Sequence, residues 1–258
     1  MKNFNLKRFM QVVRYIFGIH RNSYIKAIMI FFLVFLFFFF IYTLLPENDA
    51  VSRLSMLKHC AGIGVITLVF TMFISAGLAF SPLFKKRQSA INYLMLPASR
   101  LEKFVASESL AIVCSMVSCV IGFVAADLLQ WVFSMIFGKP DAVLASQFFV
   151  SGWKAHFDGS ADSFTTIVSL LWLISFFMLG GSFFRKVPPL FTFIILIAIT
   201  LLLGYILSHI YDTKQEIKVV ISDAGMIWIL AVLTIINVAI AYILFRRMPL
   251  VGRKWFNV

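Results

Sequence analysis

Charged residues are scarce in this chain. They make up 13% of its 258 residues, whereas hydrophobic residues make up 61%, and the mean hydropathy is +0.96. Soluble domains are nearer half apolar and about a quarter charged, so the composition excludes an ordinary soluble protein and predicts a multi-pass membrane protein. The net charge of +12 comes from basic residues in short segments beside apolar runs. Because membrane topology explains such residues, we expect no nucleic-acid partner.

Cysteines and catalytic motifs are also few. The three cysteines, Cys60, Cys114 and Cys119, lie in or beside apolar runs, and none has the spacing of a metal site or a disulfide framework. We expect them to pack as small apolar residues. The sequence has no Walker-type GxxxxGK[ST] loop, no HExxH and no GxSxG. We therefore predict that the chain is not an enzyme and binds no cofactor or metal itself.

Six apolar segments are long enough to cross the hydrocarbon core, which takes about 20 helical residues. These are 27–45, 61–80, 109–137, 167–184, 189–210 and 226–245. The first follows a long basic stretch and lacks a small-residue cleavage site, so we expect it to be retained as a span. Two prolines, Pro188 and Pro189, suit the start of the fifth span. The predicted fold is an all-α membrane protein, with six transmembrane helices in a single domain over 1–258.

The distribution of basic residues predicts the orientation. Seventeen of the 23 Lys and Arg residues lie at the two termini and in the second and fourth loops, and six lie on the other side. The positive-inside rule then places both termini in the cytoplasm.

The segment 4–21 has the pattern of an amphipathic helix lying on the membrane surface. Its apolar positions recur at the spacing of one helical face and are Leu6, Phe9, Met10, Val13, Ile16 and Phe17. The cations predicted to meet anionic headgroups are Lys7, Arg8, Arg14 and Arg21. Gly18 and the polar residues after it would allow a turn into the first span. A simple anchor that only sets the orientation is the alternative.

The second loop, 81–107, contains a helix start signal. Ser99 would cap the helix, and Glu102 three residues later would reach back to the free N–H of the cap. Leu101, Phe104 and Val105 would then face the membrane or the bundle, which leaves Arg100, Glu102 and Lys103 toward the cytoplasm. Upstream, Lys85, Lys86 and Arg87 suit lipid headgroups. The apolar run 93–97 at the loop centre needs something to cover it.

The run 92–104, NYLMLPASRLEKF, resembles the loop after the second span in six-span permease subunits of bacterial ABC exporters. About a dozen residues carry this resemblance, and the span layout extends it over nearly the whole chain. It implies a bacterial cytoplasmic (inner) membrane protein and a separate ABC-type ATPase subunit that holds ATP and magnesium. It also implies a homodimer, or a heterodimer with a second permease. The residues that would couple to the ATPase are Tyr93, Leu96, Pro97, Ser99, Arg100, Glu102 and Lys103. The last outer loop, 211–224, is shorter than in larger members of that class.

Asp127 is the one acid well inside an apolar run. It is either a gate or substrate contact within the pathway, or an interfacial residue if the third span ends near Ala126. Glu108, at the cytoplasmic mouth of the same span, is expected to be interfacial. Gly77, Gly180 and Gly181 are small enough to let spans pack closely.

The sequence therefore predicts the permease subunit of an ATP-driven ABC exporter, coupled to its ATPase through the loop between spans two and three. One alternative is a stand-alone transporter or channel driven by an ion gradient, which would need several intramembrane ionisable groups. Another is a membrane scaffold that transports nothing.

Overall fold

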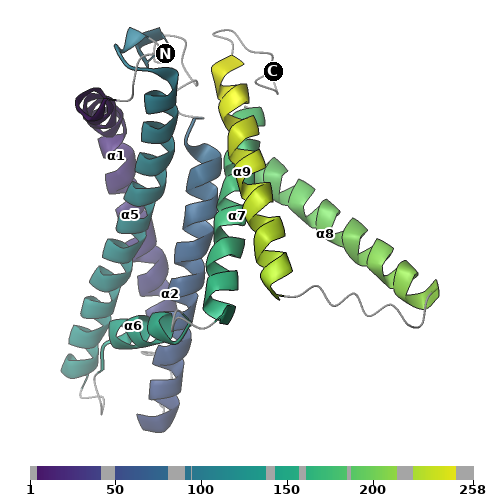
Figure 1. The fold of residues 1–258 in the computed structure, drawn as a ribbon. Helices are drawn as coiled ribbons and strands as arrows, with labels where there is room; N and C mark the ends of the chain where they lie inside the picture. The colour runs from purple at the N-terminus through teal and green to yellow at the C-terminus, as the bar shows by residue number, and fades with distance from the viewer. Residues whose placement is uncertain are drawn as a thin grey trace. The chain divides into compact units, whose positions relative to one another are not determined.

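The computed structural model describes residues 5–41, 50–80, 91–93, 95–137, 143–156, 161–184, 187–213 and 223–247, and these form helices with no β-sheet (Figure 1). Six of the helices are long and apolar enough to cross a membrane, as the sequence predicted. The helices are α1 (Leu6–Phe39), α2 (Ala50–Leu78), α5 (Arg100–Ile136), α6 (Ala145–His156), α7 (Ala161–Phe183), α8 (Pro188–Thr213) and α9 (Asp223–Arg247).

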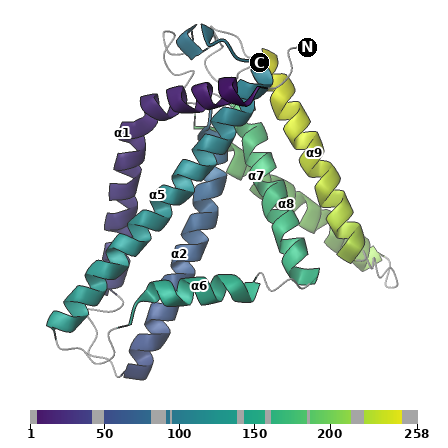
Figure 2. The ribbon, with the colours of Figure 1, turned by 60° about the vertical axis from the view of Figure 1, so that its left-hand side comes forward.

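Several helices run beyond the apolar segments that identified them. α5 has 37 residues and is therefore about 55 Å long, whereas the hydrocarbon core is about 30 Å thick. Part of α5 must therefore extend beyond the hydrocarbon, and we expect this to include its polar first turns, before the apolar part that begins near Ser109. Segments 4–21 and 27–45 were predicted as two elements, but Leu6–Phe39 is one continuous helix that changes direction along its length (Figure 2). The helix runs on through Gly18, so the turn predicted after it does not separate two elements.

The helices form two compact units, and α1, α2, α5 and α7 contribute to both, α7 with only its first three residues in unit 2. Unit 1 comprises Met1–Val12, Phe73–Glu108 and Phe164–Val258, and unit 2 comprises Val13–Met72 and Ser109–Ser163.

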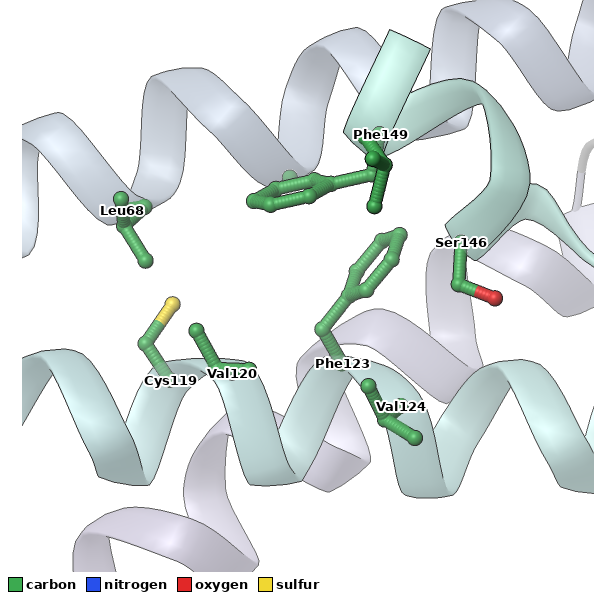
Figure 3. Close-up of a pocket in the computed structure, with 9 residues that line it drawn as sticks. Leu68, Cys119, Val120, Phe123, Val124, Ser146 and Phe149 are labelled. Carbon is green, nitrogen blue, oxygen red and sulfur yellow. The ribbon is translucent and has the colours of Figure 1, made fainter. Parts of the chain in front are cut away.

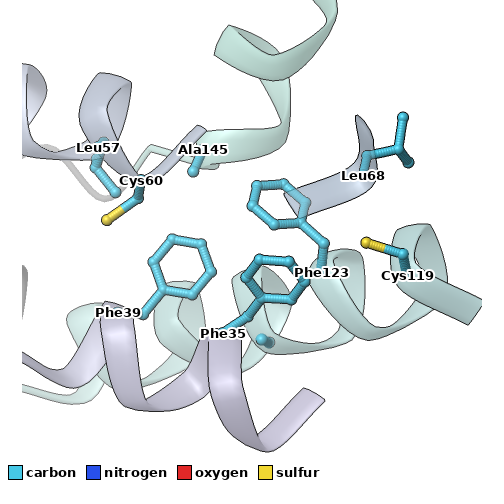
Figure 4. Packing of buried hydrophobic residues seen from close by; sticks show 9 residues of the cluster. Phe35, Phe39, Leu57, Cys60, Leu68, Cys119, Phe123 and Ala145 are labelled. Atoms are coloured by element: carbon cyan, nitrogen blue, oxygen red, sulfur yellow. The ribbon is translucent and has the colours of Figure 1, made fainter. Parts of the chain in front are cut away.

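The core of unit 2 is built around phenylalanines of α1 and α5 (Figure 4). The ring of Phe123 meets Phe35 edge to face, with centroids 5.1 Å apart, and also contacts Phe39 at 5.8 Å. Such aromatic pairs add to the stabilisation that burial alone provides. Cys60 and Cys119 are buried in the same core and are free thiols, in keeping with their prediction as small apolar residues.

In unit 1, α2 and α7 cross at two glycines. A Cβ atom on Gly181 would lie 2.6 Å from the carbonyl oxygen of Gly77, so the two backbones are too close for a side chain there. One turn away, the rings of Phe73 and Phe177 stack at 5.5 Å. The predicted close packing at Gly77 and Gly181 is therefore present. It depends on small residues because lipid-embedded helices associate through close contact rather than through a hydrophobic driving force.

The segment between α5 and α7 contains the 12-residue helix α6, which runs across α2 within unit 2 (Figure 2). It is shorter than the roughly 17 residues that a spanning helix needs.

Candidate functional site

The start of α5 has the predicted capping box. The backbone N–H of Glu102 donates to the Ser99 hydroxyl oxygen at 3.2 Å, and the Ser99 N–H donates to the Glu102 carboxylate at 2.7 Å. These reciprocal bonds satisfy two donors that a helix start would otherwise leave without partners.

The same carboxylate also binds the start of α1, which the sequence did not predict. The backbone N–H of Asn5 donates to Oε1 of Glu102 at 2.8 Å, and the Arg8 guanidinium lies 3.5 Å from that oxygen. The Asn5 side chain in turn caps α1 by accepting the N–H of Lys7 at 2.9 Å. One carboxylate thus joins two helix starts that are 97 residues apart in the chain. Negative charge is favourable at both, because helix N-termini carry partial positive charge.

Glu102 is fully buried and Lys103 is 5% exposed, so the prediction that both point toward the cytoplasm is wrong. The carboxylate of Glu102 is covered by its own partners at the edge of the fold rather than by a deep core. Burial raises its pKa, but the N–H groups of Asn5 and Ser99 together with the Arg8 charge outweigh burial and lower the pKa overall. Burial, followed by the charge of Arg100, lowers the pKa of Lys103.

Tyr93 fastens the loop to the first turns of α5. It is fully buried, and its hydroxyl lies 2.8 Å from the carbonyl oxygen of Lys103 and 2.7 Å from the Ser107 hydroxyl. The Lys103 ammonium lies 5.8 Å from the centre of the Tyr93 ring, within cation–π range. Burial raises the pKa of Tyr93. The α5 helix therefore covers Tyr93, the first residue of the apolar loop centre, but leaves Met95 of the same run uncovered.

The end of α9 joins the same place. Arg100 donates from Nη1 to the carbonyl oxygen of Arg246 at 2.9 Å, which satisfies a backbone acceptor at the C-terminal end of that helix. Behind this contact, the Phe104 ring packs against Phe80 and Phe245, with both centroids 5.5 Å away. We call Tyr93, Arg100, Glu102 and Lys103, with the groups they bind, the junction. It connects α1, α5 and α9 within unit 1.

The exposed part of this region adjoins the junction and shares Arg100 with it. Met95 is 80% exposed and Leu101 is 46% exposed, and both Pro97 and Arg100 are also exposed. We call these four residues the exposed patch. Leu96 and Ser99 are half-buried. Of the seven predicted coupling residues, Pro97 and Arg100 are therefore exposed, whereas Tyr93, Glu102 and Lys103 are buried.

The first part of α1 presents three faces. Val12 and Ile16 are buried in the protein, whereas Leu6, Met10 and Phe17 are exposed on an adjacent apolar face. Three of the four predicted surface cations are exposed and are spaced seven residues apart: Lys7, Arg14 and Arg21. This spacing puts them on one side of the helix, where they could contact lipid headgroups. Arg8 is half-buried against Glu102 instead. Lys85, Lys86 and Arg87 lie outside the described residues.

Asp127 is buried, and α5 continues for nine residues beyond it, so the helix itself does not end near Ala126. That the membrane span ends there, with Asp127 at the outer interface, stays a prediction. Its two carboxylate oxygens accept the first backbone N–H groups of α6, from Ala145 at 2.9 Å and from Ser146 at 2.8 Å. Asp127 therefore caps α6 and fixes it to α5. Its two oxygens have partners, and this structural role accounts for its burial.

Glu108 is only 3% exposed and is therefore buried in the protein, while its place at the membrane interface stays a prediction. Neither carboxylate oxygen has a hydrogen-bond partner among the described residues. Burying a carboxylate without partners costs free energy, so Glu108 is a functional candidate. Hydropathy alone does not reveal this residue, because it adjoins the polar start of α5.

Within the described ranges, no three His, Cys, Asp or Glu side chains gather as a metal site would require. Comparison with known proteins found no matching family model, no matching curated protein and no matching solved structure.

Proposed function

We propose that this chain is the membrane-spanning permease subunit of an ATP-driven ABC exporter and receives its motion from a separate cytoplasmic ATPase at the junction. The observation that carries the proposal is the placement of Glu102, whose carboxylate binds the starts of both α1 and α5 beside the exposed patch. The resemblance of residues 92–104 to permease loops supplies the class of partner.

The exposed patch is where the ATPase would press. Met95 and Leu101 offer apolar area to a partner, and Arg100 adds a positive charge. A push there reaches α5 directly, α1 through Glu102, and α9 through the bond from Arg100 to Arg246. The three helix ends would move together, and the spans would shift between two packed arrangements. In this scheme Tyr93, Glu102 and Lys103 are positioning residues inside the junction, and two six-span subunits together form the pathway.

Purification from the native host, with and without mild crosslinking, tests the proposal. We expect an ATP-binding cassette subunit in near-equal amount by mass spectrometry. Met95→Glu puts a charge on the most exposed apolar residue of the patch and should abolish this association. Asn22→Glu is the matched control, because Asn22 is an exposed residue of α1 that does not belong to the patch, and this variant should retain the partner. A preparation without the ATPase, or one in which Met95→Glu keeps it, would contradict the proposal.

A stand-alone proton-driven transporter is a second candidate, and Glu108 is the observation that favours it. A buried carboxylate without hydrogen-bond partners among the described residues has the character of a group that takes up and releases a proton. In proteoliposomes with a trapped pH-sensitive dye, a proton channel of this kind would dissipate an imposed pH gradient by itself, whereas a coupled transporter would do so only when its substrate is present. Glu108→Gln would abolish either effect. If the intact protein leaves the gradient unchanged without added substrate, a proton channel is excluded.

A further inference from the structure

Unit 2 contains a pocket of about 190 Å³ between α2, α5 and α6 (Figure 3). Leu68 of α2 and Cys119 of α5 face each other at one side, and the rings of Phe123 and Phe149 lie at the other. Gly64 also lines it, and a Cβ atom there would lie 2.8 Å from the Phe123 ring. The pocket therefore exists in its present shape because position 64 carries no side chain.

The pocket has the chemistry of a dry, apolar site. Ser146 supplies the one side-chain oxygen among its lining residues, and the rest are aliphatic, aromatic, glycine or thiol. A water molecule needs two to four polar partners, whereas an apolar cavity of about 150 Å³ stays dry and binds benzene or xenon. An occupant of this pocket should therefore be a hydrocarbon group.

The mouth of the pocket opens on the apolar surface of α5. Val120 and Val124 line the pocket and are still 40% and 39% exposed. They continue an exposed apolar stripe that includes Val113, Val117 and Ile121 on the same face of the helix. Because this part of α5 belongs to a helix that is long and apolar enough to cross a membrane, we infer that the hydrocarbon of the bilayer meets the mouth.

We propose that this pocket binds one acyl chain of a bilayer glycerophospholipid. Acyl chains are the apolar groups at highest concentration at the mouth. The residues that line an empty void lack van der Waals contacts on that side, and an acyl chain that enters the pocket restores those contacts. α6 forms one wall through Phe149 and Val150. Asp127 holds that wall in place by binding the first N–H groups of α6. The inference does not depend on the proposed function.

Photolabelling in nanodiscs tests it. The protein is placed in phosphatidylcholine that contains a small fraction of the same lipid with a diazirine in the middle of one acyl chain, and labelled peptides are mapped by mass spectrometry. We expect the 119–124 and 146–150 segments to be labelled several-fold more than the segment with Val113 and Val117, which is at least as exposed. Val120→Phe should reduce that label several-fold by filling the mouth. The matched variant Val117→Phe should leave it unchanged.

Cys119→Phe provides a second filling variant, in case the ring at position 120 turns outward, and gel filtration shows whether each variant stays folded. The proposal would be overturned if labelling of the unsubstituted protein simply follows side-chain exposure. This comparison of segments within one protein needs no variant. The proposal would also be overturned if neither filling variant reduces the label. Crosslinks that join the lining segments to a second copy of the chain would overturn it as well, because the stripe would then be covered by protein.

Discussion

Glu102→Gln is the sharpest test of how the junction holds together. The carboxylate accepts one backbone N–H on each oxygen, from Asn5 at 2.8 Å and from Ser99 at 2.7 Å. The amide of glutamine has nearly the same size but only one oxygen, so it can accept one of these bonds and must present N–H groups to the other donor. It also removes the charge opposite Arg8.

The magnitude follows from these contacts. A hydrogen bond to a charged group contributes about 1.5–3 kcal/mol, and a partly exposed ion pair such as the one with Arg8 contributes about 0–1 kcal/mol. Because Glu102 lies at the edge of the fold, we take the lower value of about 1.5 kcal/mol for the lost bond. Every 1.4 kcal/mol is a factor of ten, so amides in the first turn of α1 should exchange about tenfold faster. Glu102→Ala loses both bonds and should raise exchange about a hundredfold.

Hydrogen–deuterium exchange, resolved by peptide, measures the loss of protection in the first turn of α1 itself. Asp127→Asn is the matched control, because it makes the same chemical change at a carboxylate that also binds two backbone N–H groups. It should speed exchange at the start of α6 and leave the first turn of α1 unchanged, whereas Glu102→Gln should do the reverse. If Glu102→Gln leaves exchange in the first turn of α1 unchanged, the view that this carboxylate holds α1 to α5 is refuted.

Two further predictions concern the same unit. The pKa of Glu102 lies below the ordinary carboxyl value of 4.5, so its stabilisation is fully present above about pH 4.5 and declines as pH falls toward the lowered pKa. Exchange in the first turn of α1, corrected for its intrinsic pH dependence, should therefore rise only below that pH, and a rise near pH 6 would contradict this. Gly181→Val should lower the thermal unfolding midpoint in detergent, with a cost of about 1–3 kcal/mol, because its Cβ would lie 2.6 Å from the Gly77 oxygen. Gly204→Val, with nothing within 4 Å, should not lower the midpoint.

The parts of the fold that the sequence predicted are those determined by residues close together in the chain. Six spans follow from runs of about 20 apolar residues, and the capping box follows from the three-residue spacing of Ser99 and Glu102. Both are present in the structure. The boundaries were less accurate because hydropathy detects only the part of a helix that suits hydrocarbon. The polar first turns of α5 and the continuous path of α1 therefore did not appear as parts of spanning helices.

The parts that the sequence did not predict depend on distant partners. Glu102 was expected to be exposed because its own helix gives no reason to bury it, and the Asn5 amide that covers it is 97 residues away. Asp127 was read as a gate or an interfacial residue because its partners follow 18 and 19 residues later, in a helix of only 12 residues. A single polar residue in an apolar run shows that a partner is needed, but not which one.

Glu102 and Asp127 serve the same purpose on α5, which explains how a chain with so few acids uses them inside the protein. Each presents both carboxylate oxygens to backbone N–H groups at helix starts, and each binds the start of a helix other than its own. Serine or asparagine could cap one helix locally, but a carboxylate has two oxygens and a full charge, so it can hold two donors strongly. α5 is therefore the helix to which α1 and α6 are fixed. Under the proposed function, a push on the exposed patch would reach α1 through the contacts of Glu102 with Asn5 and Arg8, so Glu102→Gln should weaken coupling even where the ATPase still binds.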